Sequence, residues 1–220
     1  MAQPSLLTPL QRTFLEEFFQ QPISAEFFLT GGTAVAEYYL HHRYSEDIDL
    51  FTTNEDALPD ISSALPVMFR HLDATFEERI RTTSFRQVFV RAANGEELKI
   101  DLVRDVGPQF GEHQVLDKII VDSELNIAAN KVTAIFGRTA PKDFVDLYFL
   151  IKKGYTLDAL IPLAKEKDLG FSEFYFAGML RQSRRLGTLP RMIVPLTLEE
   201  LGPFYESLAT QIMLQLKPRE

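Results

Sequence analysis

The sequence predicts an α+β protein with a small, partly antiparallel sheet and helices around it, followed by a part made only of helices. Two observations support this fold class. Up to about residue 104, short runs that alternate polar and apolar residues, typical of strands, lie between segments with helical apolar spacing. Beyond residue 124 only the helical spacing recurs. We therefore divide the chain into a sheet-bearing part, residues 1–123, and a helical part, residues 124–220.

The elements of the sheet-bearing part follow from local signals. The first helix opens with the capping-box spacing of Thr8 and Gln11 and has Pro9 at its first position. The pair Gly31-Gly32 separates a short apolar strand from the helix after it, and Asn94-Gly95 marks a hairpin turn. In order, we predict a helix at about 9–20, a strand at 27–29, a helix at 33–42, a strand at 47–51, a helix at 55–72, and strands near 75–82, 85–92 and 97–104.

The helical part is predicted from apolar spacing and one clear start signal. Its helices are expected at about residues 125–137, 141–152, 157–167, 171–186 and 197–216. The last one opens with a second capping box, formed by Thr197 and Glu200. Residues 150–220 carry no motif that indicates a function, so this stretch is only a candidate for contacting an acceptor substrate.

The composition excludes several classes of function. With no Cys, the chain has no disulfide framework, no thiol catalysis and no cysteine-ligated zinc. It has no basic and then apolar leader at its start, and no apolar run approaches the ~18 residues that cross a bilayer. We therefore expect a cytoplasmic protein without a membrane segment. The net charge of −8 argues against non-specific binding of nucleic acid.

One local exception to this acidity is a group of arginines near the C-terminal end. It consists of Arg181, Arg184, Arg185 and Arg191. A run of charge is usually a solvated face, which is the interpretation we favour, and contact with a phosphate backbone is the alternative.

Three aspartates are the candidate catalytic and metal-binding residues. Asp47 and Asp49 lie two apart on a predicted strand, so both side chains project from one face. Asp101 lies on another predicted strand, which could be a neighbour in the sheet. Three carboxylates from two strands offer the all-oxygen site that Mg²⁺ prefers, and two such ions promote displacement at phosphorus. Taken singly, the Asp-x-Asp pair is typical of a solvated face, and Asp101 could simply pair with Lys99.

The order of these features strengthens the functional interpretation. A strand, a double-glycine turn and a helix come directly before the strand with the paired acids. Backbone N–H groups at the start of that helix can hold phosphate oxygens while metal ions neutralise them.

These residues resemble a known family. Residues 28–34, Phe-Leu-Thr-Gly-Gly-Thr-Ala, and residues 43–50, Arg-Tyr-Ser-Glu-Asp-Ile-Asp-Leu, are similar to the AbiEii/AbiGii-type toxin nucleotidyltransferases of the DNA polymerase β-like superfamily. The resemblance implies the nucleotidyltransferase fold and a two-metal Mg²⁺ site. It implies phosphate binding by Gly31, Gly32 and Thr33, metal binding by Asp47 and Asp49, and a third acid at Asp101. Arg43 and Ser45 are expected to fix the loop before the acids, with Arg43 also a candidate phosphate contact.

A second block in the helical part extends the resemblance to about residues 26–150. Lys131, Arg138 and the run from Lys142 to Leu147 are similar to the family's lysine, arginine and basic-Asp-x-x-Asp-Leu signature, which implies contacts with the triphosphate. Lys142 and Asp146 are spaced i, i+4, so one helical face presents base and acid together and could orient Lys131 or Arg138 toward a phosphate. The alternative is a surface ion pair of well under ~1 kcal/mol.

The leading functional hypothesis is therefore transfer of a nucleoside monophosphate from an NTP to a hydroxyl. The resemblance implies a tRNA 3′ end as the first candidate acceptor, a protein hydroxyl as the second, and a separate antitoxin as partner. A catalytically silent module that binds a nucleotide or a partner with the same fold is the alternative. The paired acids also resemble those of haloacid-dehalogenase-like phosphatases, but residues 41–46 cannot form the buried strand that those acids follow. His41 and His42 are expected to cap a helix and not to bind metal.

Overall fold

The computed structural model describes residues 4–216. The chain divides into two compact units, one with residues up to 106 together with 111–123, and one with residues 107–110 and those from 124 onward. We refer to them as the sheet unit and the helical unit. Among the described residues, no helix is both long and apolar enough to span a membrane.

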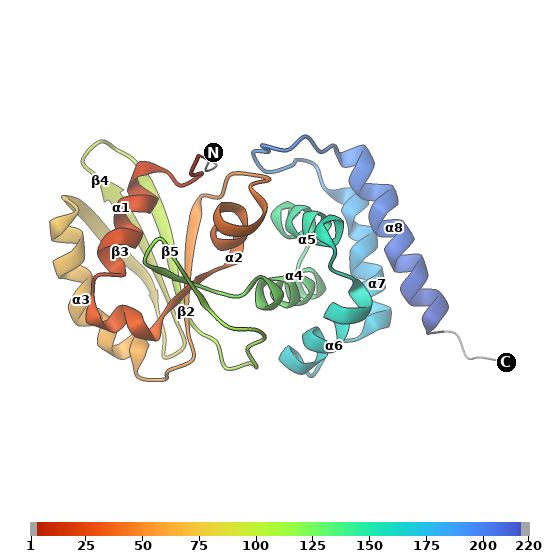
Figure 1. The fold of residues 1–220 in the computed structure, drawn as a ribbon, viewed down its shortest axis with the longest axis horizontal. Coiled ribbons are helices and arrows are strands. Elements are labelled where there is room, and N and C mark those ends of the chain that lie inside the picture. The colour runs from red at the N-terminus through yellow and green to blue at the C-terminus, as the bar shows by residue number, and fades with distance from the viewer. Residues whose placement is uncertain (1–3, 217–220) are drawn as a thin grey trace. The chain divides into compact units, whose positions relative to one another are not determined.

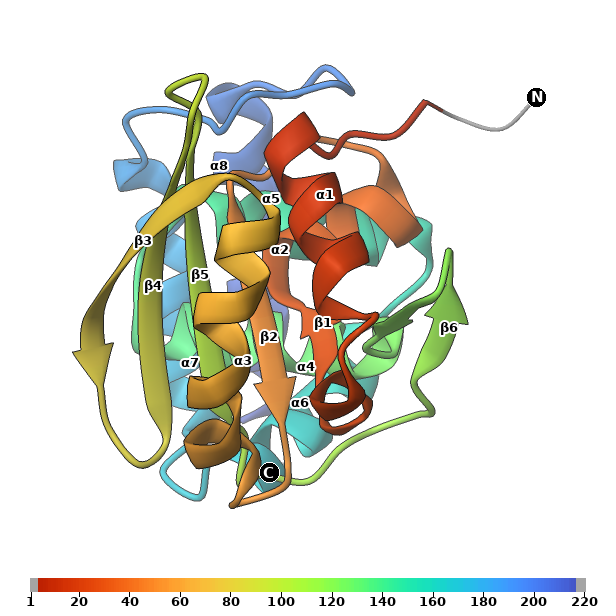
Figure 2. The same cartoon turned by 90° about the vertical axis from the view of Figure 1, so that its left-hand side faces the viewer.

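A seven-stranded mixed sheet forms the sheet unit within the described residues. Its strands are β1 (Phe28–Thr30), β2 (Asp47–Thr52), β3 (Ala74–Arg81), β4 (Phe85–Ala92), β5 (Glu97–Arg104), β6 (Gln114–Leu116) and β7 (Ile119–Val121). They lie in the order β3-β4-β5-β2-β1-β7-β6 (Figure 2). The pairs β2–β5 and β1–β7 are parallel and the others are antiparallel. The predicted antiparallel hairpins are confirmed, and the sheet is mixed.

The two faces of this sheet differ in burial. Figure 2 shows helices α1 (Pro9–Phe18) and α3 (Ala57–His71) lying over one face. Phe14 of α1 stacks on Phe69 of α3, with ring centroids 6.0 Å apart. Strands β2, β4 and β5 alternate buried with half-buried residues, as a strand with one covered face does. The half-buried set, on the opposite face, includes the three predicted aspartates.

Most predicted elements of the sheet unit are confirmed within two residues. The helix after the glycine pair starts earlier than expected, as α2 (Gly31–Ala34), and continues as a π-helical segment, η2 (Val35–Leu40). His41 ends it with a left-handed φ of 50°, at the predicted capping position. A short 3-10 helix, η1 (Pro22–Glu26), precedes β1.

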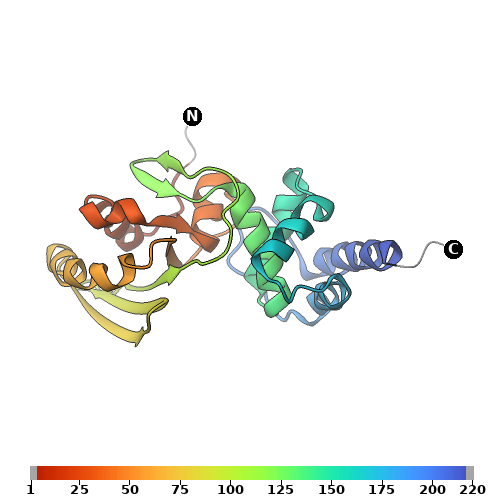
Figure 3. The same ribbon diagram turned by 90° about the horizontal axis from the view of Figure 1, so that it is seen from below.

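The β6–β7 hairpin, green in Figure 3, was not expected from the sequence. Each strand has three residues, and the turn between them places Asp117 and Lys118 at φ values of 49° and 67°. Two-residue hairpin turns of this type usually carry Asn-Gly, so an Asp-Lys pair gives no turn signal.

The helical unit is a cluster of helices around its own core (Figures 1 and 3). It contains α4 (Glu124–Gly137), α5 (Pro141–Lys153), α6 (Leu157–Lys167), α7 (Glu173–Leu180), the 3-10 helix η3 (Arg181–Arg185) and α8 (Leu198–Gln215). Phe144, Phe176 and Tyr205 are fully buried at the centre, and the Tyr205 hydroxyl donates to the Phe144 carbonyl. The expected helix at 171–186 is divided, since its second half is the 3-10 segment η3.

Candidate active site

The three predicted aspartates lie on one face of the sheet because of strand register. Strands β2 and β5 are parallel neighbours in which Asp49 pairs with Asp101 and Asp47 pairs with Lys99. Residues that are paired across strands, or two apart along one strand, project from the same face. Asp47, Asp49 and Asp101 therefore share the half-buried face, together with Lys99 and Gln87, the β4 partner of Asp101.

Lys99 lies between two of these acids. Its ammonium is 3.1 Å from Asp47 Oδ2 and 3.0 Å from Asp101 Oδ2, and Gln87 Nε2 donates to the other Asp101 oxygen at 3.0 Å. Burial by itself would lower the pKa of Lys99, but hydrogen bonds and charge from the two carboxylates outweigh it and raise that pKa. Lys99 is therefore a stable cation that holds Asp47 and Asp101.

The acids share a face without closing into one ligand set. Within residues 4–216 the structure contains no group of three acidic or histidine side chains placed to hold one metal ion. The donor chemistry nevertheless fits Mg²⁺, because three partly exposed carboxylates supply oxygen ligands and the Lys99 ammonium already stands in for a cation between two of them.

The glycine turn lies directly against Asp49. Gly31 has a left-handed φ of 69°, and a Cβ atom there would lie 2.1 Å from Asp49 Oδ2. A Cβ atom at Gly32 would lie 2.6 Å from Arg43 Nη2 and 3.0 Å from Ser45 Oγ. A side chain at Gly31 would collide with Asp49, so the turn and this carboxylate can approach each other only with glycine there, whereas a side chain at Gly32 would press on Arg43 and Ser45.

Thr33 of α2, and Arg43 and Ser45 of the loop before β2, lie beside the acids. The Thr33 hydroxyl donates to the Asp47 carbonyl, and the buried Arg43 donates from Nη1 to the Tyr44 carbonyl at 2.9 Å. Gln11 of α1 donates to the Ser45 carbonyl at 2.9 Å. These contacts hold the backbone carbonyls of Tyr44, Ser45 and Asp47 at the start of β2.

The predicted basic block of the helical unit is a buried ion network. Lys131 Nζ lies 2.8 Å from Asp143 Oδ1 and 2.7 Å from Asp146 Oδ2, and Arg138 Nε lies 2.8 Å from Asp143 Oδ2. Both aspartates are fully buried and Lys131 is nearly so, whereas the Arg138 side chain is 60% exposed. Burial by itself would raise the pKa of Asp143, but Lys131 and Arg138 outweigh it and lower that pKa. The network is therefore not a weak surface ion pair. Lys142, which directly precedes Asp143 in the sequence, is half-buried.

Comparison with known proteins identifies the family. A family described as "Nucleotidyl transferase AbiEii toxin, Type IV TA system" matches residues 13–174. The chain belongs to the AbiEii nucleotidyltransferase toxin family. It is an enzyme of the nucleotidyltransferase class, and the matched residues include the three aspartates, the glycine turn and the basic block.

Individual relatives of this AbiEii protein agree in sequence or in fold. An uncharacterised protein of Aquifex aeolicus (strain VF5) is 31% identical over 158 residues, which are 71% of this chain and 73% of that protein. JHP933 from Helicobacter pylori has 22% identity over 94% of this chain and 90% of that chain, with a TM-score of 0.59. MenT4, a nucleotidyltransferase toxin of Mycobacterium tuberculosis H37Rv, has 13% identity over 94% and 83%, with a TM-score of 0.57. The two structures share the fold with this chain.

Two residues beside the site of this AbiEii enzyme were not singled out from the sequence. Gln87 holds Asp101, and its position on an alternating strand was the only signal for it. The buried Asp122 accepts from the hydroxyl of Thr30, directly before the glycine turn, at 2.6 Å, and its carbonyl accepts from Tyr39 at 2.6 Å. No motif surrounds Asp122, so the sequence carries no signal for this role.

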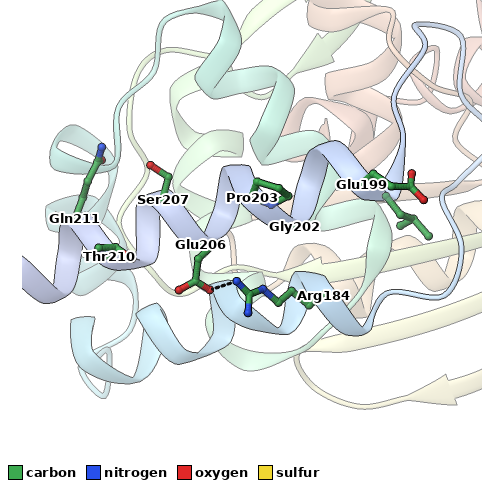
Figure 4. Close-up of a pocket in the computed structure, with 9 residues that line it drawn as sticks. Arg184, Glu199, Gly202, Pro203, Glu206, Ser207, Thr210 and Gln211 are labelled. Atoms are coloured by element: carbon green, nitrogen blue, oxygen red, sulfur yellow. Dashed lines mark ion pairs between the residues drawn. The ribbon is translucent and has the colours of Figure 1, made fainter.

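The arginine group near the C-terminal end lies beyond the family match. Arg181 Nε and Arg184 Nη2 each lie 3.1 Å from an oxygen of Glu206 on α8. Figure 4 shows the Arg184–Glu206 pair in a groove lined by residues of α8. Two of the four arginines are thus held by an acid of the same unit, which supports the interpretation of a charged, solvated face.

Proposed function

We propose that this AbiEii nucleotidyltransferase transfers a nucleoside monophosphate from an NTP to an acceptor hydroxyl in a Mg²⁺-dependent reaction, with Asp47, Asp49 and Asp101 as the metal-binding and catalytic residues. The observation that carries this proposal is the pairing of Asp49 with Asp101 across β2 and β5, which supports a common role for carboxylates that are far apart in sequence. Because Gly31 has no side chain, the glycine turn lies directly against Asp49, which supports a role for the turn beside the proposed metal ligands.

The proposed reaction is an in-line displacement at the α-phosphorus. The acceptor oxygen forms a bond to phosphorus, the bond to the pyrophosphate oxygen breaks, and one of the carboxylates takes the hydroxyl proton. Bound Mg²⁺ ions would supply charge neutralisation at the attacking and leaving oxygens. Thr33 would hold the Asp47 carbonyl, and Arg43 and Ser45 would fix the loop before it.

We assign phosphate binding to two further groups, as the family resemblance implies. Backbone N–H groups of the turn at Gly31 and Gly32 are proposed to hold phosphate oxygens. The basic block of the helical unit, Lys131, Arg138, Lys142 and Asp146, is proposed to contact the triphosphate, with the exposed guanidinium of Arg138 as its most accessible cation. Buried Lys131 would act mainly by holding Asp143 and Asp146.

The proposal also names an acceptor substrate and a partner protein. A tRNA 3′ end is the first candidate acceptor and a protein hydroxyl is the second. Because the family belongs to type IV toxin–antitoxin systems, we propose that the protein acts as a toxin and is opposed by a separate antitoxin.

Label transfer tests the proposal directly. The protein is incubated with each labelled NTP, Mg²⁺ and either total tRNA or a cell extract, and we expect label on one class of acceptor. Asp47→Asn and Asp49→Asn should each abolish transfer, whereas Asp117→Asn, an exposed acid in a turn where Asn is well tolerated, should leave it unchanged.

Two results would contradict the proposal. Transfer that persists in both site variants would remove the acids from the chemistry. Binding of Mg-NTP without label on any acceptor would favour the alternative of a catalytically silent nucleotide- or partner-binding module.

A further inference from the structure

Lys99 occupies a position on the sheet from which its ammonium reaches two of the proposed metal ligands. It lies opposite Asp47 in the β2–β5 register and two residues before Asp101 on β5. Its ammonium contacts Oδ2 of both carboxylates, and 27% of the side chain is exposed. Lys99 therefore has a path to solvent while it holds the acids.

Lys99 and a metal ion compete for the same two carboxylates. A divalent cation coordinated by Asp47 and Asp101 needs lone pairs of these carboxylates and would face the ammonium at short range, where like charges repel. A lysine can leave such a position, because its charge is carried on a flexible four-carbon stem and makes no bidentate fork with a carboxylate.

We propose that Lys99 is an exchangeable internal cation. It holds Asp47 and Asp101 together in the metal-free protein and is displaced when a divalent ion binds these carboxylates. The inference rests on the proposed function, since it takes the acids as metal ligands, and it adds that this chain weakens its own metal affinity. Because binding equilibria are reciprocal, the lysine that stabilises the metal-free site competes with the metal by the same factor.

Metal binding without nucleotide tests this inference by calorimetry. Mn²⁺ or Mg²⁺ alone is titrated into the full chain, into Lys99→Met and into Lys165→Met. Lys165 pairs with Glu173 in the helical unit, so its variant loses one positive charge and one exposed ion pair, as a matched control. We expect Lys99→Met to bind the metal at least about fivefold more tightly, the lower end of common coupling strengths, and the control to match the unaltered protein.

Two further measurements exclude the explanation that tighter binding follows merely from the loss of one positive charge. In the absence of metal, Lys99→Met should melt at a lower temperature than the unaltered protein. Saturating Mn²⁺ should then raise the melting temperature of Lys99→Met by more than it raises that of the unaltered protein. Lys99→Arg, which keeps the charge and can grip a carboxylate through two N–H groups, should bind the metal more weakly than the unaltered protein. It also provides a test if Lys99→Met fails to fold.

The outcomes separate this inference from the proposed function. If the unaltered protein binds metal, Asp47→Asn does not, and Lys99→Met binds no more tightly than the control, the displacement inference is wrong while the metal site stands. If no variant binds a divalent ion at millimolar concentration, both are wrong. If Lys99→Met binds the metal more tightly but the unaltered protein transfers no label to any acceptor, the result supports the exchange of Lys99 for a metal ion and contradicts only the proposed transfer reaction.

Discussion

Replacing Gly31 by alanine tests whether the turn and the Asp49 carboxylate depend on each other. The added Cβ atom would lie 2.1 Å from Asp49 Oδ2, 2.8 Å from its Cγ and 3.0 Å from its Cβ. Rotation of the Asp49 side chain relieves the contacts with Oδ2 and Cγ but displaces the carboxylate, and the tight contact with Cβ remains unless the strand or the turn shifts. Alanine also has to adopt a φ of 69°, which L-residues avoid.

Both costs can be given a magnitude. Left-handed backbone at a non-glycine residue costs about 1–2 kcal/mol, and insertion of a methyl group into filled space costs about 1–3 kcal/mol. We expect Gly31→Ala to lower the free energy of unfolding by about 2–5 kcal/mol. Because Asp49 is displaced, nucleotidyl transfer should fall at least about a hundredfold, the effect of a misplacement on the order of 1 Å.

A second glycine in the same unit is a matched control. Gly95 has a φ of 85°, but a Cβ atom there meets nothing within 4 Å. Gly95→Ala should therefore lose only the conformational part, about 1–2 kcal/mol, and keep its transfer activity. Urea unfolding and label transfer measure both quantities. If Gly31→Ala is no less stable and no less active than Gly95→Ala, the contact with Asp49 has no energetic or functional role.

Two further predictions concern the ion network of the helical unit. Lys131→Met leaves the buried carboxylates of Asp143 and Asp146 without the Lys131 ammonium, and we expect the free energy of unfolding in urea to fall by about 3–5 kcal/mol. The control Lys153→Met breaks the exposed pair with Glu124 and should lower it by under about 1 kcal/mol. Equal losses in the two variants would refute the argument. Because the pKa of Asp143 is lowered in the folded protein, its stabilisation is present above the ordinary Asp value of 3.8 and is lost as pH falls through the lowered pKa. The melting temperature should therefore fall with acidification in this range, and the fall should be shallower in Asp143→Asn; identical slopes would contradict the assignment.

Local features of this protein are determined by its sequence alone. Both capping boxes, at Thr8 and at Thr197, form as predicted, because a cap involves only residues three positions apart. The alternation along residues 47–52 correctly indicates a strand with Asp47 and Asp49 on its less buried face, since the side-chain period of a strand is a property of the backbone. The family resemblance, carried by short motifs, is also confirmed.

Tertiary structure decided which distant residues meet. The parallel pairing of β2 with β5 brings Asp101 beside Asp49. The same register places Lys99 so that it contacts Asp47 as well as Asp101, the acid with which the sequence suggested it could pair. Packing of α4 against α5 buried a charge network that the helical spacing could equally have left on the surface. Strand pairing and burial depend on residues many positions apart, and no local period or motif encodes that long-range choice.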